Sequence, residues 1–133
     1  MSKEPILETE RLILRPITLD DAKACFSWNS DERVTKYMSY PTLTDISQTI
    51  DWIKSTLTDE KEYNFAFVLK EENKVIGTGS IGPSSKIEGY WGMGYNLHFD
   101  YWHKGYCTEA MKAIIDYVPV SYTHLTLPTN SLV

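Results

Sequence analysis

The sequence contains little cysteine and no long apolar run. Only two of its 133 residues are cysteines, Cys25 and Cys107, and they stand far apart without forming a Cys-x-x-Cys pair. This spacing argues against a structural disulfide and against a cysteine-ligated metal. Residues 1–20 hold no apolar core of signal-peptide type, and no window is long enough to span a bilayer. We therefore expect a cytoplasmic protein with no metal site and no membrane partner.

Positive charge is scarcer than negative charge. Lys and Arg number 13 against 18 Asp and Glu, which gives a formal net charge of −5 at pH 7. A nucleic-acid-binding surface needs a basic face that displaces counterions, so no nucleic-acid partner is expected. The acidic balance is ordinary for cytoplasmic proteins, and it also suits a cationic or amine-bearing substrate. The nucleotide-binding pattern Gly-x-x-x-x-Gly-Lys-Ser/Thr is absent, which argues against a P-loop.

The first half of the chain predicts one strand followed by helices. Apolar residues make up 42% of a chain whose length suits a single globular domain. A short strand is expected at Leu12–Leu14. Thr18 and Asp21 resemble a capping box that begins a helix running to about Trp28. Asp45 and Gln48 form a second cap, and the apolar residues that follow at helical spacing predict a helix over residues 45–58.

The second half predicts an antiparallel meander and a closing helix. Strands are expected at Asn64–Leu69, Val75–Ile81 and Tyr90–Phe99, with a tight turn at residues 71–74 that makes the first two a hairpin. From Gly105 onward the apolar residues return to helical spacing. This last helix is expected to pack on the sheet.

The final residues depart from the composition of the rest. Residues 120–133 contain no Asp, Glu, Lys or Arg. We place a boundary at residues 118–120, with 1–118 as the N-terminal portion of a domain and 119–133 as an off-pattern tail. Residues 121–129 resemble translated adaptor sequence at the end of an assembled reading frame, which favours a foreign tail on a truncated gene. The alternative is a divergent natural strand, because residues 122–127 alternate polar and apolar side chains.

The most informative segment is the strand, glycine turn and helix start over residues 94–110. A helix that begins near Gly105 leaves the N–H groups of its first turn unpaired, with the positive end of the helix dipole behind them. Lys104 adds a positive charge, and Glu109 is expected to favour the helix start through the dipole. His98 and His103 have no partner at metal-ligand spacing. The segment therefore predicts a phosphate-binding turn and no metal.

The same segment resembles a known family. Residues 102–110, Trp-His-Lys-Gly-Tyr-Cys-Thr-Glu-Ala, resemble the acyl-CoA-binding turn of GNAT N-acetyltransferases, whose pattern is Gln/Arg-x-x-Gly-x-Gly/Ala. Gly105 matches, whereas Trp102 and Cys107 depart from the pattern in a way that the RimJ/RimL-like branch shares. Residues 8–16 and 75–81 also resemble that branch.

The resemblance implies a fold, a reaction and a site. The implied fold is α/β (α+β), a mostly antiparallel central sheet with flanking helices, here incomplete at the C-terminus. The implied reaction transfers an acetyl group from acetyl-CoA to a primary amine, on a protein N-terminus or a small molecule. The alternative is a non-catalytic CoA-binding module or an inactive fragment. The implied acetyl-CoA-binding residues are Tyr95, Asn96, Leu97, His103, Lys104, Gly105, Tyr106, Cys107 and Thr108.

The resemblance leaves the catalytic groups unassigned. Many members carry a glutamate base two residues before the Gly-Tyr pair, and Gly92 stands there in this chain. Glu88 and Tyr95 are the remaining candidates. Cys107 is interpreted as a small buried residue and not as a nucleophile. Three aromatic residues of the early helices are candidates for the acceptor side, with core packing as the alternative: Trp28, Tyr37 and Tyr40.

Overall fold

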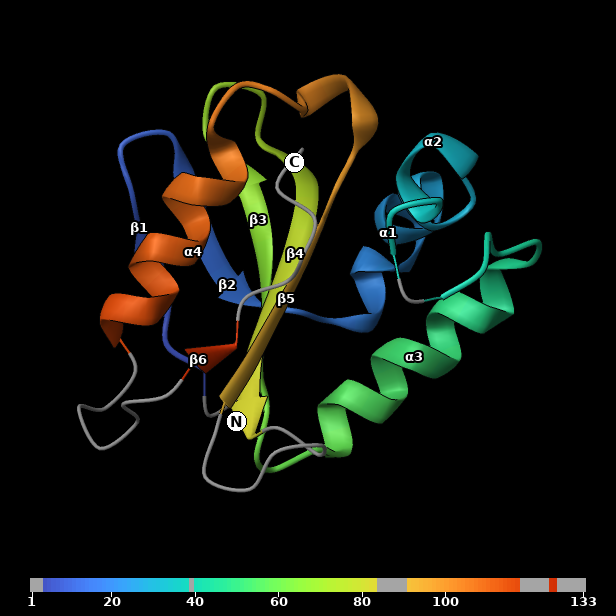
Figure 1. Ribbon diagram of the computed structural model, residues 1–133, viewed down its shortest axis with the longest axis horizontal. Helices are drawn as coiled ribbons and strands as arrows, with labels where there is room; N and C mark the ends of the chain where they lie inside the picture. The colour runs from blue at the N-terminus through green and yellow to red at the C-terminus, as the bar shows by residue number, and fades with distance from the viewer. Residues whose placement is uncertain (1–3, 39, 84–90, 118–124, 127–133) are drawn as a thin grey trace.

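The computed structural model describes residues 4–38, 40–83, 91–117 and 125–126. A single sheet with strand order β1-β2-β3-β4-β5-β6 carries helices on both faces (Figure 1). The strands are β1 (Leu7–Glu8), β2 (Leu12–Pro16), β3 (Tyr63–Leu69), β4 (Lys74–Pro83), β5 (Trp91–Leu97) and β6 (Leu125–Thr126). The helices are η1 (Leu19–Asp21), α1 (Ala22–Asn29), α2 (Glu32–Thr35), α3 (Ile46–Thr58), η2 (Phe99–Tyr101) and α4 (Tyr106–Tyr117).

Neighbouring strands from β1 to β5 pair antiparallel, and β6 alone runs parallel to its neighbour. The predicted α+β fold, with a mostly antiparallel sheet and flanking helices, is confirmed. The predicted β3–β4 hairpin is confirmed, and it closes at residues 70–73, one position before the predicted turn at 71–74. None of the helices in the described ranges combines the length and the apolarity needed to cross a bilayer.

The helix starts follow the capping residues that the sequence shows. The Asp21 carboxylate accepts the Thr18 backbone N–H at 2.9 Å, and the Asp45 carboxylate accepts that of Ser47 at 2.8 Å. Asp21 also forms two hydrogen bonds with the Arg15 guanidinium, at 2.7 and 2.9 Å. Burial tends to raise the pKa of the Asp21 carboxyl, but the hydrogen bonds and charge of Arg15 and the bonds from Thr18 outweigh it and lower the pKa.

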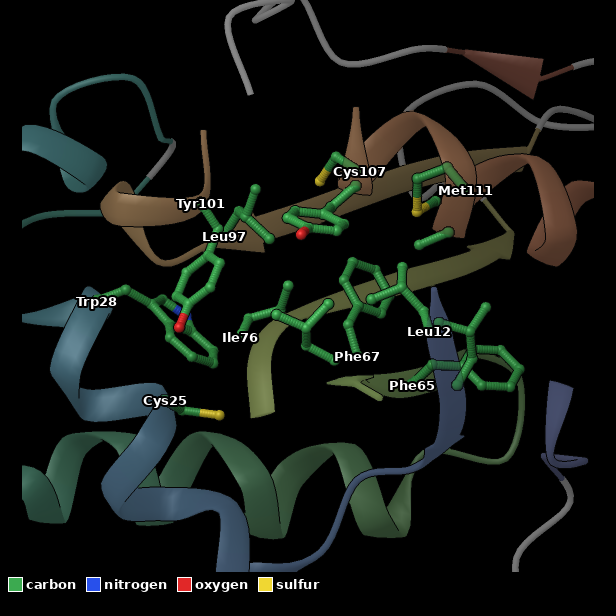
Figure 2. Packing of buried hydrophobic residues seen from close by; sticks show 14 of the residues in the cluster. Leu12, Cys25, Trp28, Phe65, Phe67, Ile76, Leu97, Tyr101, Cys107 and Met111 are labelled. Carbon is green, nitrogen blue, oxygen red and sulfur yellow. The ribbon is translucent and has the colours of Figure 1, made fainter. Parts of the chain in front are cut away.

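The core lies on both faces of the sheet. On one face, α4 packs closely because β4 carries glycine beneath it. A Cβ atom at Gly79 would lie 2.5 Å from Cζ of Phe67 and 2.9 Å from Sδ of Met111. On the other face, α1 contributes the fully buried side chains of Cys25 and Trp28 (Figure 2). Both faces of the sheet are therefore covered, and β4 lies between α1 and α4.

Several element ends differ from the sequence prediction. The first strand continues to Pro16, and the predicted strand Val75–Ile81 spans Lys74–Pro83. The third predicted strand ends at Leu97 and not at Phe99, because the His98 side chain accepts the Asp100 N–H at 3.2 Å and begins η2. Tyr90, its predicted first residue, lies outside the described residues. The last helix begins at Tyr106, since Gly105 has a left-handed φ of +81°.

The predicted tail is described at two positions only. Leu125 and Thr126 pair in parallel with Trp91 and Gly92 of β5. The remainder of residues 118–133 lies outside the described part of the chain. The boundary at residues 118–120 and the foreign origin of the tail stay predictions.

Candidate functional site

The turn before α4 presents a row of backbone N–H groups. His103 and Gly105 have left-handed φ values of 64° and 81°, which turn the chain sharply into the helix. The first bond of the helix runs from the Glu109 N–H to the Gly105 carbonyl at 3.0 Å. No described residue accepts a hydrogen bond from the N–H groups that precede it, those of Tyr106, Cys107 and Thr108. Such a helix start is suited to bind an anion.

The turn is joined to the start of β2 by the Glu109 side chain. Its carboxylate accepts the Thr9 hydroxyl at 2.5 Å, the Arg11 backbone N–H at 2.9 Å and Arg11 Nε at 2.7 Å. Arg11 Nη1 also donates to the Lys104 carbonyl at 3.0 Å, and its guanidinium lies 4.2 Å from the centre of the Tyr106 ring. We call Thr9, Arg11 and Glu109 the β2–α4 clamp.

The clamp explains the state of the Glu109 carboxyl. Burial tends to raise its pKa, but hydrogen bonds from Thr9 and Arg11 together with the charge of Arg11 lower the pKa below the usual range. From the sequence, Glu109 was expected to act through the helix dipole alone, and its hydrogen bonds with Thr9 and Arg11 were not predicted. Local patterns cannot relate residues 98 positions apart. The one available signal is that Thr9, Arg11 and Glu109 all fall in segments that carried the family resemblance.

The end of β5 is fixed by an indole. The His98 N–H donates to the Ile76 carbonyl at 2.8 Å, and the antiparallel alternation then directs the main-chain groups of Tyr95 and Leu97 away from β4. Buried Trp102 donates Nε1–H to the Leu97 carbonyl at 2.8 Å. Trp102 therefore packs in the core, where its indole fixes the strand end. The Leu97 carbonyl, expected to face a pantetheine arm, is already engaged.

The thiol and the phenol near the turn are both held neutral. Cys107 is buried, as predicted, and burial raises the pKa of its thiol to about 12, which disfavours the thiolate that a nucleophile needs. Burial also raises the pKa of half-buried Tyr95. Glu88, the other catalytic candidate, lies outside the described residues. Among the described residues, no three His, Cys, Asp or Glu side chains gather as a possible metal site.

A cavity of about 520 Å³ opens beside β4 and β5. Its lining is uncharged and comes from the early helices and the sheet: Asn29, Tyr37, Met38, Tyr40, Leu43, Gln48, Trp52, Asn64, Thr78, Gly79, Ser80, Met93, Gly94, Tyr95 and Asn96. The Tyr40 hydroxyl lies 2.9 Å from Oδ1 of Asn29 and 2.6 Å from Oδ1 of Asn96. The cavity is therefore lined on one side by the early helices and the segments between them, and on the other by β4 and β5; the Tyr40 hydroxyl connects the two sides.

The structure divides the predicted site residues between two places. Tyr95 and Asn96 line the cavity, whereas His103 to Thr108 form the turn and belong to no part of its lining. Tyr37 and Tyr40 reach the cavity, as considered for the acceptor side. Trp28 is 1% exposed and packs in the core, so for that residue the alternative holds. Asn29 and Asn64 also line the cavity but were not among the predicted site residues, because asparagines scattered along a sequence form no recognisable pattern.

Comparison with known proteins agrees with this arrangement. Residues 11–131 match the family described as Acetyltransferase (GNAT) domain. The chain is 39% identical over 124 residues to the uncharacterised N-acetyltransferase p20 of Bacillus licheniformis, a match that covers 91% of this chain and 68% of p20. It therefore spans about two thirds of that relative's length.

Solved structures share the fold. An acetyltransferase of the GNAT family from Bacillus anthracis is similar with a TM-score of 0.70 and 25% identity, over 85% of this chain and 65% of that one. RimL, a ribosomal L7/L12 alpha-N-protein acetyltransferase in complex with coenzyme A, is similar with a TM-score of 0.71 and 14% identity, over 85% and 67%. Because the family match extends over residues 11–131 and the fold agrees, the chain belongs to the GNAT acetyltransferase family.

Proposed function

We propose that the turn before α4 binds the pyrophosphate of acetyl-CoA and that the protein transfers the acetyl group to a primary amine. One observation carries the proposal: three backbone N–H groups without an acceptor among the described residues follow a left-handed glycine in a GNAT domain. Phosphate oxygens are the acceptors that such a helix start favours. RimL in complex with coenzyme A has the same fold, which supports acetyl-CoA as the co-substrate.

The proposed roles of the residues follow from their places. His103, Lys104 and Gly105 shape the turn, and the amides of Tyr106, Cys107 and Thr108 donate to the pyrophosphate. Lys104 adds a positive charge beside it. In this proposal the pantetheine arm runs along β5, where the main-chain groups of Tyr95 and the N–H of Leu97 face away from β4 and orient the arm and the thioester; the Leu97 carbonyl is engaged by Trp102 and takes no part.

The cavity beside β4 and β5 is the proposed acceptor site. A thioester is attacked by a neutral amine, so a proton must leave the nitrogen and a proton must reach the departing thiolate. Tyr95, like any tyrosine, carries its proton at neutral pH, and burial raises its pKa further, so it can donate a proton to the departing thiolate and is a poor base. No carboxylate of the described residues lines the cavity, and the base stays unassigned. A protein N-terminus and a small amine are both candidate acceptors.

Titration calorimetry and a thiol-release assay test the proposal. We expect the chain to bind acetyl-CoA, and amines to increase the release of free CoA thiol. Binding without amine-dependent release favours the alternative, a non-catalytic CoA-binding module. Absence of binding contradicts the proposed site in this chain.

A further inference from the structure

Arg11 of the β2–α4 clamp contacts the turn before α4, although it lies 93 positions before Lys104 in the sequence. Glu109 stands one position after the last of the three presented N–H groups, and Arg11 bridges from it to the Lys104 carbonyl. The guanidinium therefore bonds to residues on both sides of Gly105. A Cβ atom at Gly105 would lie 3.4 Å from Arg11 Nη2, so the guanidinium runs alongside the turn itself.

We propose that Arg11 is a positioning residue for acetyl-CoA, which through Glu109 and the Lys104 carbonyl holds the turn in its anion-binding conformation. The inference rests on the proposed function, because it assumes that the turn is the phosphate site. The turn needs a left-handed backbone at His103 and Gly105. Glycine adopts this conformation freely, but at His103 it is costly and persists only where the surroundings impose it. The clamp supplies that restraint.

The clamp also controls a charge. The Glu109 carboxylate stands at the helix start, where it is an anion beside the site of another anion. Arg11 neutralises it with two hydrogen bonds, from its backbone N–H and from Nε. Without Arg11 the carboxylate would repel the pyrophosphate or bond to the same N–H groups. Loss of the Arg11 side chain alone is thus expected to weaken CoA binding more than loss of the Arg11 and Glu109 charges together.

A second arginine–carboxylate pair, four residues further along the chain, provides the control. Arg15 of β2 donates to Asp21 from both guanidinium Nη atoms at 2.7 and 2.9 Å, its acid is more deeply buried than Glu109, and it forms no recorded hydrogen bond with the turn. Arg15→Met therefore removes a neighbouring arginine–carboxylate pair without touching the turn. If Arg11 contributes stability alone, both variants should affect acetyl-CoA binding in proportion to their loss of stability.

Titration calorimetry of the 133-residue chain with CoA distinguishes the two roles. We expect Arg11→Met to weaken CoA binding about tenfold, and Arg11→Met with Glu109→Gln to recover to within about threefold of wild type. Arg15→Met should bind CoA as wild type does while unfolding at lower urea. Unchanged binding by Arg11→Met, or equal weakening by Arg15→Met, overturns the positioning role.

A second readout separates this inference from the proposed function. If the wild-type chain binds no CoA, the proposed function fails, and amide hydrogen exchange still tests the clamp. Faster exchange of the Glu109 N–H in Arg11→Met but not in Arg15→Met supports the restraint on the turn. Equal exchange in the two variants overturns it.

Discussion

The Tyr40 hydroxyl lies 2.6 Å from Oδ1 of Asn96 and so joins the segment between α2 and α3 to β5. The same hydroxyl is 2.9 Å from Oδ1 of Asn29 on α1. The hydroxyl carries a single hydrogen and donates it to one of the two carboxamide oxygens at a time; we call Asn29, Tyr40 and Asn96 the Tyr40 unit. This unit holds the helical wall of the cavity against the strand that carries Tyr95.

Tyr40→Phe is expected to destabilise the protein by about 1–3 kcal/mol, because it leaves the carboxamide oxygens of buried Asn29 and half-buried Asn96 without their hydroxyl partner. Urea denaturation measures this as a lower midpoint at unchanged slope. Tyr37→Phe is the matched control, since Tyr37 also lines the cavity and its hydroxyl has no hydrogen-bond partner recorded among the described residues. Equal urea midpoints for the two variants would show that the bonds of the Tyr40 hydroxyl to Asn29 and Asn96 do not stabilise the fold.

Gly105→Ala is expected to cost about 1–2 kcal/mol, because an L side chain disfavours the left-handed backbone at φ +81°. CoA binding should weaken as the turn relaxes. Gly105→Asn should lose less, since asparagine tolerates this region better than alanine. Calorimetry and urea denaturation of both variants measure the difference, and an alanine variant as stable as wild type would refute the strain.

Gly79→Ala is expected to destabilise the contact between α4 and the sheet by about 1–3 kcal/mol, the usual cost of overpacking. The added methyl would lie 2.5 Å from Cζ of Phe67 and 2.9 Å from Sδ of Met111. Gly94→Ala is the control on the neighbouring strand, where the nearest atom is Ser80 Oγ at an ordinary 3.7 Å. Thermal or urea unfolding of the pair should separate them clearly.

Both thiols are expected to be unreactive in the folded protein. Cys25 and Cys107 are free and buried, and burial raises the pKa of each thiol to about 12. A disulfide reagent at neutral pH should therefore modify neither in native buffer and both in urea. Rapid native labelling of Cys107 would show that the start of α4 opens readily.

Asp21 is expected to contribute stability that acid removes. Arg15 and Thr18 lower the pKa of Asp21 in the folded state, so its contribution is fully present above the unfolded value of about 3.9. It is lost as pH falls through the folded pKa. The difference in urea midpoint between wild type and Asp21→Asn should therefore be largest near neutral pH and shrink in strong acid. A constant difference would rule out this linkage.

Local sequence signals anticipated the elements well. The capping residues Thr18, Asp21 and Asp45 mark helix starts because their side chains bond to backbone groups within three residues. Alternation and helical spacing locate strands and helices for the same reason: each reflects one element's own geometry. The end of the third strand was placed two residues late, because the His98 bond that begins η2 has no signature in a strand pattern.

The turn at Gly105 and its row of N–H groups could be predicted from the sequence alone, since a glycine turn before a helix is a local feature. The contacts that hold this turn and the residues that line the cavity became known only from the tertiary structure. The bonds between Arg11 and Glu109 and between Tyr40 and Asn96 join residues 98 and 56 positions apart. Such contacts depend on how the sheet brings distant strands and helices together, and no spacing along the chain encodes them.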